Sequence, residues 1–75
     1  MTPIFIELTY NDDLLKFHLN INEIAFIETN TEGPGTHIYL THSIRILKVF
    51  EDRHTIIPMI DQAIYNRIAA ERDNS

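Results

Sequence analysis

The stretch that decides the fold is SIRILKVFEDRHTIIPMI, residues 43–60, because the spacing of its apolar residues changes partway along it. Residues 44–50 place apolar side chains at neighbouring and alternate positions, which predicts a strand with apolar groups on both faces. From Thr55 onward the apolar residues recur at helical spacing instead. The stretch therefore predicts a last strand, an acidic step at Glu51 and Asp52, and a helix.

The start of this helix depends on Pro58. If Asp52 were the N-cap, Pro58 would be the sixth helical residue and would cost about 3 kcal/mol in lost hydrogen bonding and steric clash. With Thr55 as the N-cap, Pro58 falls in the first turn, where no backbone hydrogen bond is lost. We therefore predict a helix from Thr55 to about Arg72. At 100° per residue one sector of it collects Ile56, Ile57, Ile60, Ala63, Ile64 and Ile68.

Four further strands are predicted upstream of this stretch. Their side chains follow a period of two, and the first two show the alternation typical of strands with one buried face. The first two strands are separated by Asn11, Asp12 and Asp13, whose turn chemistry predicts a hairpin. The segment NTEGPG at residues 30–35 contains both glycines of the chain and predicts a loop before the fourth strand. The four strands are predicted at residues 4–10, 15–21, 24–29 and 36–41.

These elements predict an α+β fold: a five-stranded curled antiparallel sheet or small barrel, followed by one C-terminal amphipathic helix. Because the chain has 75 residues, we expect a single compact domain over residues 1–72. Residues 73–75 are predicted to form a frayed, solvated tail.

Composition narrows the classes of function. The chain has no cysteine, so it can form neither a disulfide framework nor a thiolate zinc site. No basic leader precedes the first apolar residues, and no apolar run approaches the roughly 18 residues that a membrane span needs, so we expect a cytoplasmic protein without a membrane partner. The formal net charge of -5 argues against general nucleic-acid binding, which requires a basic surface.

Two features predict that the chain associates with itself. In the last predicted strand Ile44 and Ile46 point to one face while Leu47 and Val49 point to the other. One face can belong to the core, and the other needs the helix, a bend or another subunit. Tyr65 lies roughly opposite the apolar sector of the helix, where a monomer would expose it. A single exposed tyrosine is ordinary on its own. A domain of this size, however, buries only about 60% of its surface, which favours a homo-oligomer.

A loop joins two segments of the chain, IELTYNDDLLKFHLNINEIAFIET and THIYLTHSIRILKVFED, and a helix follows them. This order resembles the small flagellar FlbD/SwrD swarming-motility family over about residues 4–60. The resemblance implies the same strand order and a role in motility. The chain differs where that family has Asn-Gly in the first turn and Asn-Gly-Lys in the second hairpin. INEIAFIET, followed by a hairpin and helix, is also similar to the first half of the LytTR domain, which implies DNA binding. The basic Arg-x-His segment of that domain is missing here.

The sequence shows no constellation of groups that predicts catalysis or metal binding. The four histidines do not form a His-x-x-x-His pair, and no cysteine assists them, so we expect surface or interface histidines and no cofactor. The TEGPGT loop lacks the lysine and the strand-to-helix setting of a phosphate-binding loop. No nucleophile accompanies a base and an orienting group, so we do not expect an enzyme.

Two hypotheses of function remain. The first is a non-enzymatic interaction protein, homo-oligomeric, that acts as an accessory or inhibitor by binding another protein in a bacterial or phage context. The alternative is a ligand-sequestering protein that holds an anionic metabolite or nucleotide at a pocket built between subunits. Arg45 and Lys48 are also explained as solvent-facing charges of the last strand, on opposite faces of it. The candidate binding residues are Arg45, Lys48, Arg53, His54, His42, Glu32, Pro34, His37 and Tyr65.

Overall fold

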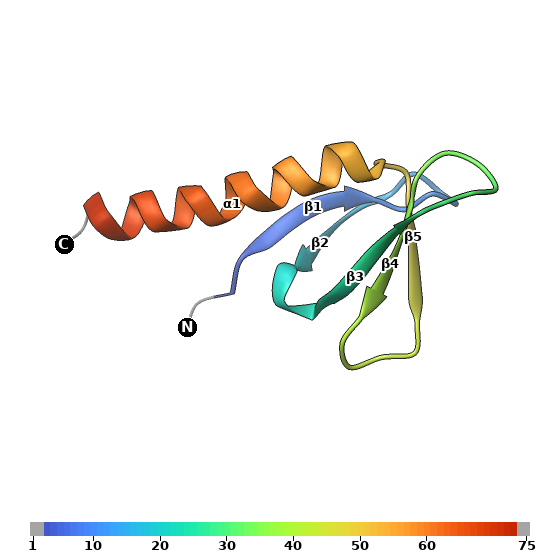
Figure 1. Ribbon diagram of the computed structural model, residues 1–75, viewed down its shortest axis with the longest axis horizontal. Coiled ribbons are helices and arrows are strands. Elements are labelled where there is room, and N and C mark those ends of the chain that lie inside the picture. The colour runs from blue at the N-terminus through green and yellow to red at the C-terminus, as the bar shows by residue number, and fades with distance from the viewer. Residues whose placement is uncertain (1–2, 74–75) are drawn as a thin grey trace.

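The computed structural model describes residues 3–73, and its architecture is α+β, as predicted. Five strands precede one long helix, and a short 3-10 turn lies between the second and third strands (Figure 1). The elements are β1 (Phe5–Thr9), β2 (Lys16–Asn20), the 3-10 turn η1 (Ile21–Glu23), β3 (Ile24–Thr29), β4 (Thr36–Leu40), β5 (Ile46–Val49) and α1 (Arg53–Asp73).

The prediction of one five-stranded sheet or barrel is wrong, because the strands form two separate antiparallel sheets. β1 pairs with β2, and β3, β4 and β5 form a three-stranded sheet in that order. The backbones of the two sheets pair at the tips of β1 and β5, through an isolated bridge between Tyr10 and Val49. The Phe50 N–H donates to the Thr9 carbonyl there, at 2.8 Å.

The sheets stay separate for a local reason at each possible junction. Between β2 and β3, η1 turns the chain away from strand geometry, and the Asn20 side chain caps this turn by accepting from the Asn22 N–H at 3.0 Å. Between β1 and β5, pairing stops because the chain leaves the strand direction after Phe50 and enters α1. The helix thus lies where a longer β5 would have continued along β1 (Figure 1).

The first hairpin closes through a four-residue turn. The Tyr10 N–H donates to the Leu15 carbonyl at 2.9 Å, and the Leu14 N–H donates to the Tyr10 carbonyl at 3.0 Å. This geometry forces Leu14 into the left-handed region with a φ of 59°, which costs a residue with a Cβ about 1–2 kcal/mol. Asp13 supports the turn by accepting from the Leu15 N–H at 3.0 Å.

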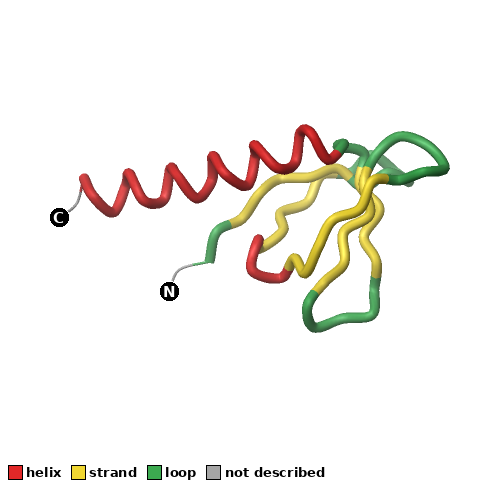
Figure 2. Tube along the Cα trace, viewed as in Figure 1, coloured by secondary structure: helices red, strands yellow, loops and turns green. Residues whose placement is uncertain are grey.

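The glycine-rich loop at residues 30–35 connects β3 to β4 (Figure 2) and is held by hydrogen bonds within the loop. Asn30 organises it, because its side chain accepts from the Glu32 N–H at 3.0 Å and donates to the Pro34 carbonyl at 3.2 Å. Gly35 is buried with a φ of 102°, and a Cβ there would overlap the backbone carbonyl of Val49. Glycine is therefore required at position 35 by both backbone conformation and space.

The helix begins earlier than predicted, since Asp52 and not Thr55 caps it. The Asp52 carboxylate accepts from the Thr55 N–H and from the Thr55 hydroxyl, both at 2.9 Å. Pro58 is consequently inside the helix. The full burial of Ile56 in the first turns, together with this cap, offsets the cost of the proline. The helix ends at Asp73, one residue beyond the prediction, and the rest of the predicted tail (74–75) lies outside the described residues.

The core lies between the concave sides of the two sheets and the first half of α1. Met59, Ile60 and Ala63 pack against it from the helix as half-buried side chains. Not every residue of the predicted apolar sector reaches it, because Ile57, Ile64 and Ile68 stay exposed. The buried apolar residues are Ile6, Leu8, Leu19, Ile38, Leu47, Val49 and Ile56.

The chain is more extended than a typical domain of its length. Its last helical turns project past both sheets (Figure 1), and its extents are 47 × 24 × 20 Å. The radius of gyration is 13.4 Å, whereas about 11 Å is expected for a compact domain of this size. Within residues 3–73 no helix has both the length and the apolar character needed to cross a membrane.

Candidate functional site

Two of the predicted binding residues lie together. Arg45 and Lys48 line one open hollow of about 210 Å³, with Tyr10 and Asp12 on its other side. We expected opposite faces of one strand, but β5 begins only at Ile46, so Arg45 belongs to the preceding turn and strand alternation does not fix its direction. The Arg45 N–H instead donates to the Ser43 hydroxyl at 3.0 Å.

The other predicted residues are dispersed. Arg53 and His54 are exposed at the start of α1 and are not among the residues that line this hollow. Glu32 and Pro34 are exposed in the loop before β4, and His42 is exposed in the turn after it. His37 points outward from β4, and Tyr65 is exposed along α1. The nine residues therefore do not form one site.

Two carboxylates, those of Asp52 and Glu7, interact with neighbouring side chains of the fold. Hydrogen bonds from the Thr55 side chain and backbone to the Asp52 carboxylate hold the pKa of Asp52 below its ordinary value of 3.8. On the outer face of the two-stranded sheet, Glu7 lies 3.7 Å from the Lys16 ammonium and 3.6 Å from the His18 ring. Both pairs are exposed, so each contributes little to stability.

Among the described residues, no three histidine, aspartate or glutamate side chains are grouped so as to hold a metal ion.

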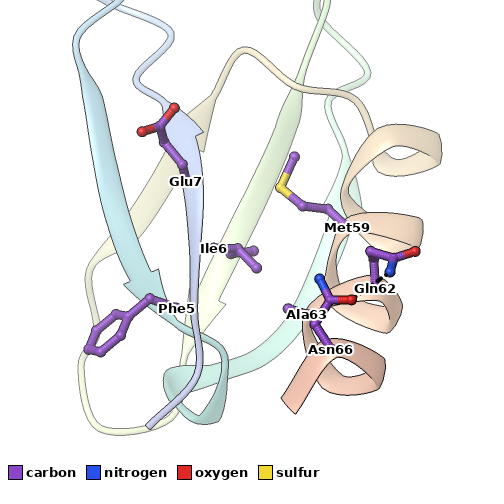
Figure 3. Close-up of a pocket in the computed structure, with 7 residues that line it drawn as sticks. All are labelled: Phe5, Ile6, Glu7, Met59, Gln62, Ala63 and Asn66. Carbon is purple, nitrogen blue, oxygen red and sulfur yellow. Dashed lines mark hydrogen bonds between the residues drawn. The ribbon is translucent and has the colours of Figure 1, made fainter. Parts of the chain in front are cut away.

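A larger groove of about 450 Å³ lies between β1 and α1. Ile6 on β1 points toward Met59 and Ala63 on the helix, whereas Phe5 and Glu7 project from the other side of the strand (Figure 3). At the rim, the Gln62 side chain donates to the Asn66 side chain at 2.9 Å. Apart from Glu7, the lining consists of apolar and neutral amide groups, which offer packing and hydrogen bonding.

The outer face of the three-stranded sheet carries an exposed apolar row. Phe26 on β3 lies opposite Tyr39 on β4, which in turn lies opposite Ile46 on β5. The Phe26 and Tyr39 rings stack with their centroids 4.2 Å apart, and Phe26 is 53% exposed. We call these three residues the aromatic row. Beside it, Glu28, His37 and Lys48 form a second, polar row in the same register.

A second apolar surface runs along α1. Ile57, Ile64 and Ile68 are 40%, 37% and 48% exposed. Their spacing of seven and four residues places them on one side of the helix, next to the half-buried side that faces the core. We call these three residues the isoleucine stripe.

The sequence pattern did not predict the aromatic row, and it placed the isoleucine stripe in one apolar sector together with the residues of α1 that face the core. One signal for the row was present, since the last strand carries apolar residues on both faces and Ile46 lies on the outer one. The pairing of Phe26 with Tyr39 depends on the register between β3 and β4, which includes a bulge between Ile24 and Phe26. Alternation within one strand cannot reveal such a register.

Comparisons of the chain with protein-family models, with curated proteins and with solved structures found no match. Function must therefore be inferred from the geometry of the chain itself.

Proposed function

We propose that the chain is a non-enzymatic interaction protein that assembles with itself and acts by binding another protein. The observation that carries this proposal is the aromatic row, in which the exposed Phe26 stacks on the half-buried Tyr39 and the row continues to the exposed Ile46. Aromatic side chains are enriched in protein interfaces, because they bury a large area at a small cost in conformational entropy. In this proposal the chain works in the cytoplasm as an accessory or inhibitor of bacterial or phage origin.

The surroundings of the aromatic row support a protein partner over a small molecule. The row is an open sheet face and not a concave pocket, which suits another folded surface. Glu28, His37 and Lys48 supply a polar rim beside it. Because the chain carries a net charge of -5, a partner with a basic surface would associate faster, and binding would weaken as salt is added.

Site-specific photocrosslinking tests the proposal. A photoreactive phenylalanine analogue replaces Phe26 in the cells that naturally produce the protein, and the matched control carries it at Asn22, which is exposed on η1 outside the row. We expect a covalent adduct with a distinct second protein at position 26 and none at position 22. Adducts only between copies of this chain, or no adduct at position 26, would contradict partner binding at this face.

The hollow lined by Arg45 and Lys48 supports ligand sequestration as a second candidate function, because two cationic side chains converge on one cavity. Asp12 in the same hollow opposes an anion and makes this candidate the weaker of the two. Inorganic phosphate and ATP are the probes. If the hollow binds anions, they raise the melting temperature of the parent protein and not that of Arg45→Ala, while Lys16→Ala behaves like the parent. No shift in the parent would exclude these ligands.

A further inference from the structure

A charged residue lies beyond each end of the isoleucine stripe. Arg53 lies four residues before Ile57, and Glu71 lies seven residues after Ile64, so both share the side of α1 that carries the stripe. Both side chains are exposed, and neither has an ion-pair partner within residues 3–73. One side of the helix therefore presents a cation at its start, three isoleucines and the exposed Asp61 along its middle, and an anion at its end.

The chain exposes more surface than is expected for a compact monomer of its mass. Its accessible surface is 5555 Å², whereas a monomeric protein of 8.8 kDa exposes about 4,800 Å². The excess of roughly 800 Å² equals the area that each partner contributes to a protein–protein interface of standard size. The projecting last turns of α1 account for part of this excess (Figure 1).

We propose that a second copy of this chain docks on the isoleucine stripe, with the two α1 helices packed antiparallel around a two-fold axis near residue 62. This inference rests on the proposed function and specifies its self-assembling surface. A two-fold axis makes the interface self-complementary, so the stripe of one copy covers the stripe of the other. The axis position follows from the charges, because residue 62 is midway between Arg53 and Glu71.

Charge complementarity selects the antiparallel arrangement. With the helices antiparallel, Arg53 of each copy lies beside Glu71 of the other, which forms two equivalent ion pairs. Opposed helix dipoles add to this attraction. A parallel pair would instead place Arg53 beside Arg53 and Glu71 beside Glu71, and it would align the dipoles. The exposed Asp61 lies next to its own copy in both arrangements, so its repulsion does not distinguish them. Because α1 projects past the sheets only at its C-terminal end, the antiparallel pair also sets the two bodies at opposite ends of the helix pair (Figure 1).

A lysine substitution tests the surface. Ile64→Lys places a charge in the middle of the stripe, and Tyr65→Lys is the matched control, since it introduces the same side chain at the next position, which is 66% exposed and off the stripe. We expect Ile64→Lys to raise the dimer dissociation constant about 100-fold or more, because both copies carry the lysine in the shared interface. Tyr65→Lys should leave the dissociation constant within about threefold of the parent.

Circular dichroism of both lysine variants tests whether each remains folded, so that lost association is not attributed to unfolding. An unchanged dissociation constant for a folded Ile64→Lys would overturn the proposed surface. Equal loss of association in Tyr65→Lys would also overturn it, because that side chain lies off the stripe.

Charge reversal tests the orientation. Arg53→Glu and Glu71→Arg each place like charges together in the antiparallel pair, and each should weaken association roughly three- to tenfold, whereas the double variant should restore it. Both single substitutions favour the isolated helix, since they put an anion at its N-terminus and a cation at its C-terminus. Weaker association therefore cannot come from loss of the helix. Single variants that associate as well as the parent would exclude the antiparallel pair.

The outcomes separate this inference from the proposed function. If Ile64→Lys remains dimeric while position 26 crosslinks to a second protein, the stripe is excluded and the interaction role stands. If position 26 forms no adduct while Ile64→Lys dissociates the dimer, partner binding at the aromatic row is excluded and the helix interface stands.

Discussion

The carboxylate of Glu51 accepts two hydrogen bonds from Thr9, one from the backbone N–H at 2.9 Å and one from the hydroxyl at 2.8 Å. The two residues are 42 positions apart. The Glu51 carbonyl also accepts from the buried Thr36 hydroxyl at 2.9 Å. Glu51 thus joins the end of β1, the start of β4 and the segment that leads into α1, at the point where the two sheets meet.

Replacement of Glu51 by alanine should lower the free energy of unfolding by about 1–3 kcal/mol, because the Thr9 N–H and hydroxyl lose their partners in a partly buried place. Chemical denaturation at one fixed protein concentration measures this change. Glu32→Ala removes an exposed loop carboxylate and serves as the control. Equal stability of the two variants would show that the Glu51–Thr9 contact contributes nothing.

Gly35→Ala should destabilise the protein by about 2 kcal/mol or more, since a Cβ would meet the Val49 carbonyl and the backbone has a positive φ. Gly33→Ala is the matched control in the same loop, because the space around Gly33 is open. It should change stability by no more than about 0.5 kcal/mol. Thermal melts of both variants measure the difference in stability. Similar melting temperatures for the two variants would contradict the loop geometry.

Leu14→Gly should make the protein more stable than Leu14→Ala by about 1 kcal/mol. Both substitutions remove the exposed leucine side chain, but only glycine relieves the left-handed backbone strain at a φ of 59°. Comparing the two variants with each other isolates the free-energy cost of the left-handed backbone conformation at position 14. If the alanine variant is the more stable of the two by denaturant titration, the first hairpin does not close with this turn.

The helix cap predicts a dependence of stability on pH. The pKa of Asp52 is lowered in the folded state by its hydrogen bonds from Thr55, so its carboxylate stabilises the fold fully above the ordinary value of 3.8. This stabilisation is lost as the pH falls through the lowered value. Asp52→Asn keeps a capping acceptor but cannot ionise.

The stability advantage of the parent over Asp52→Asn should therefore shrink between neutral pH and about pH 3. Denaturant titrations of both proteins across this range measure it. A difference that stays constant with pH would contradict a role for the ionised cap.

The sequence predicted the secondary structure well where side-chain period is decisive. The period of two upstream of residue 50 and the helical period after residue 55 identified all five strands and the helix. The helix start was wrong because Asp52 was rejected as the N-cap on the cost of Pro58 alone. The burial of Ile56 and the hydrogen bonds from Thr55 to Asp52, which offset that cost, depend on the folded structure.

The division into two sheets and the two apolar surfaces could not be predicted from period alone. Strand pairing depends on where the chain changes direction, and η1 and the Glu51 segment are short and carry no distinctive pattern. A helical period defines a side of α1 but not how much of that side the sheets cover. Ile57, Ile64 and Ile68 consequently looked like core residues, although the sheets are too small to cover them.

The mass of the assembled chain in solution tests the central claim most directly. Native mass spectrometry over a dilution series should show a species of twice the 8.8 kDa chain mass, which converts to the monomer only as the protein is diluted. Monomer alone at every concentration would contradict self-assembly and, with it, the antiparallel pairing of the isoleucine stripes.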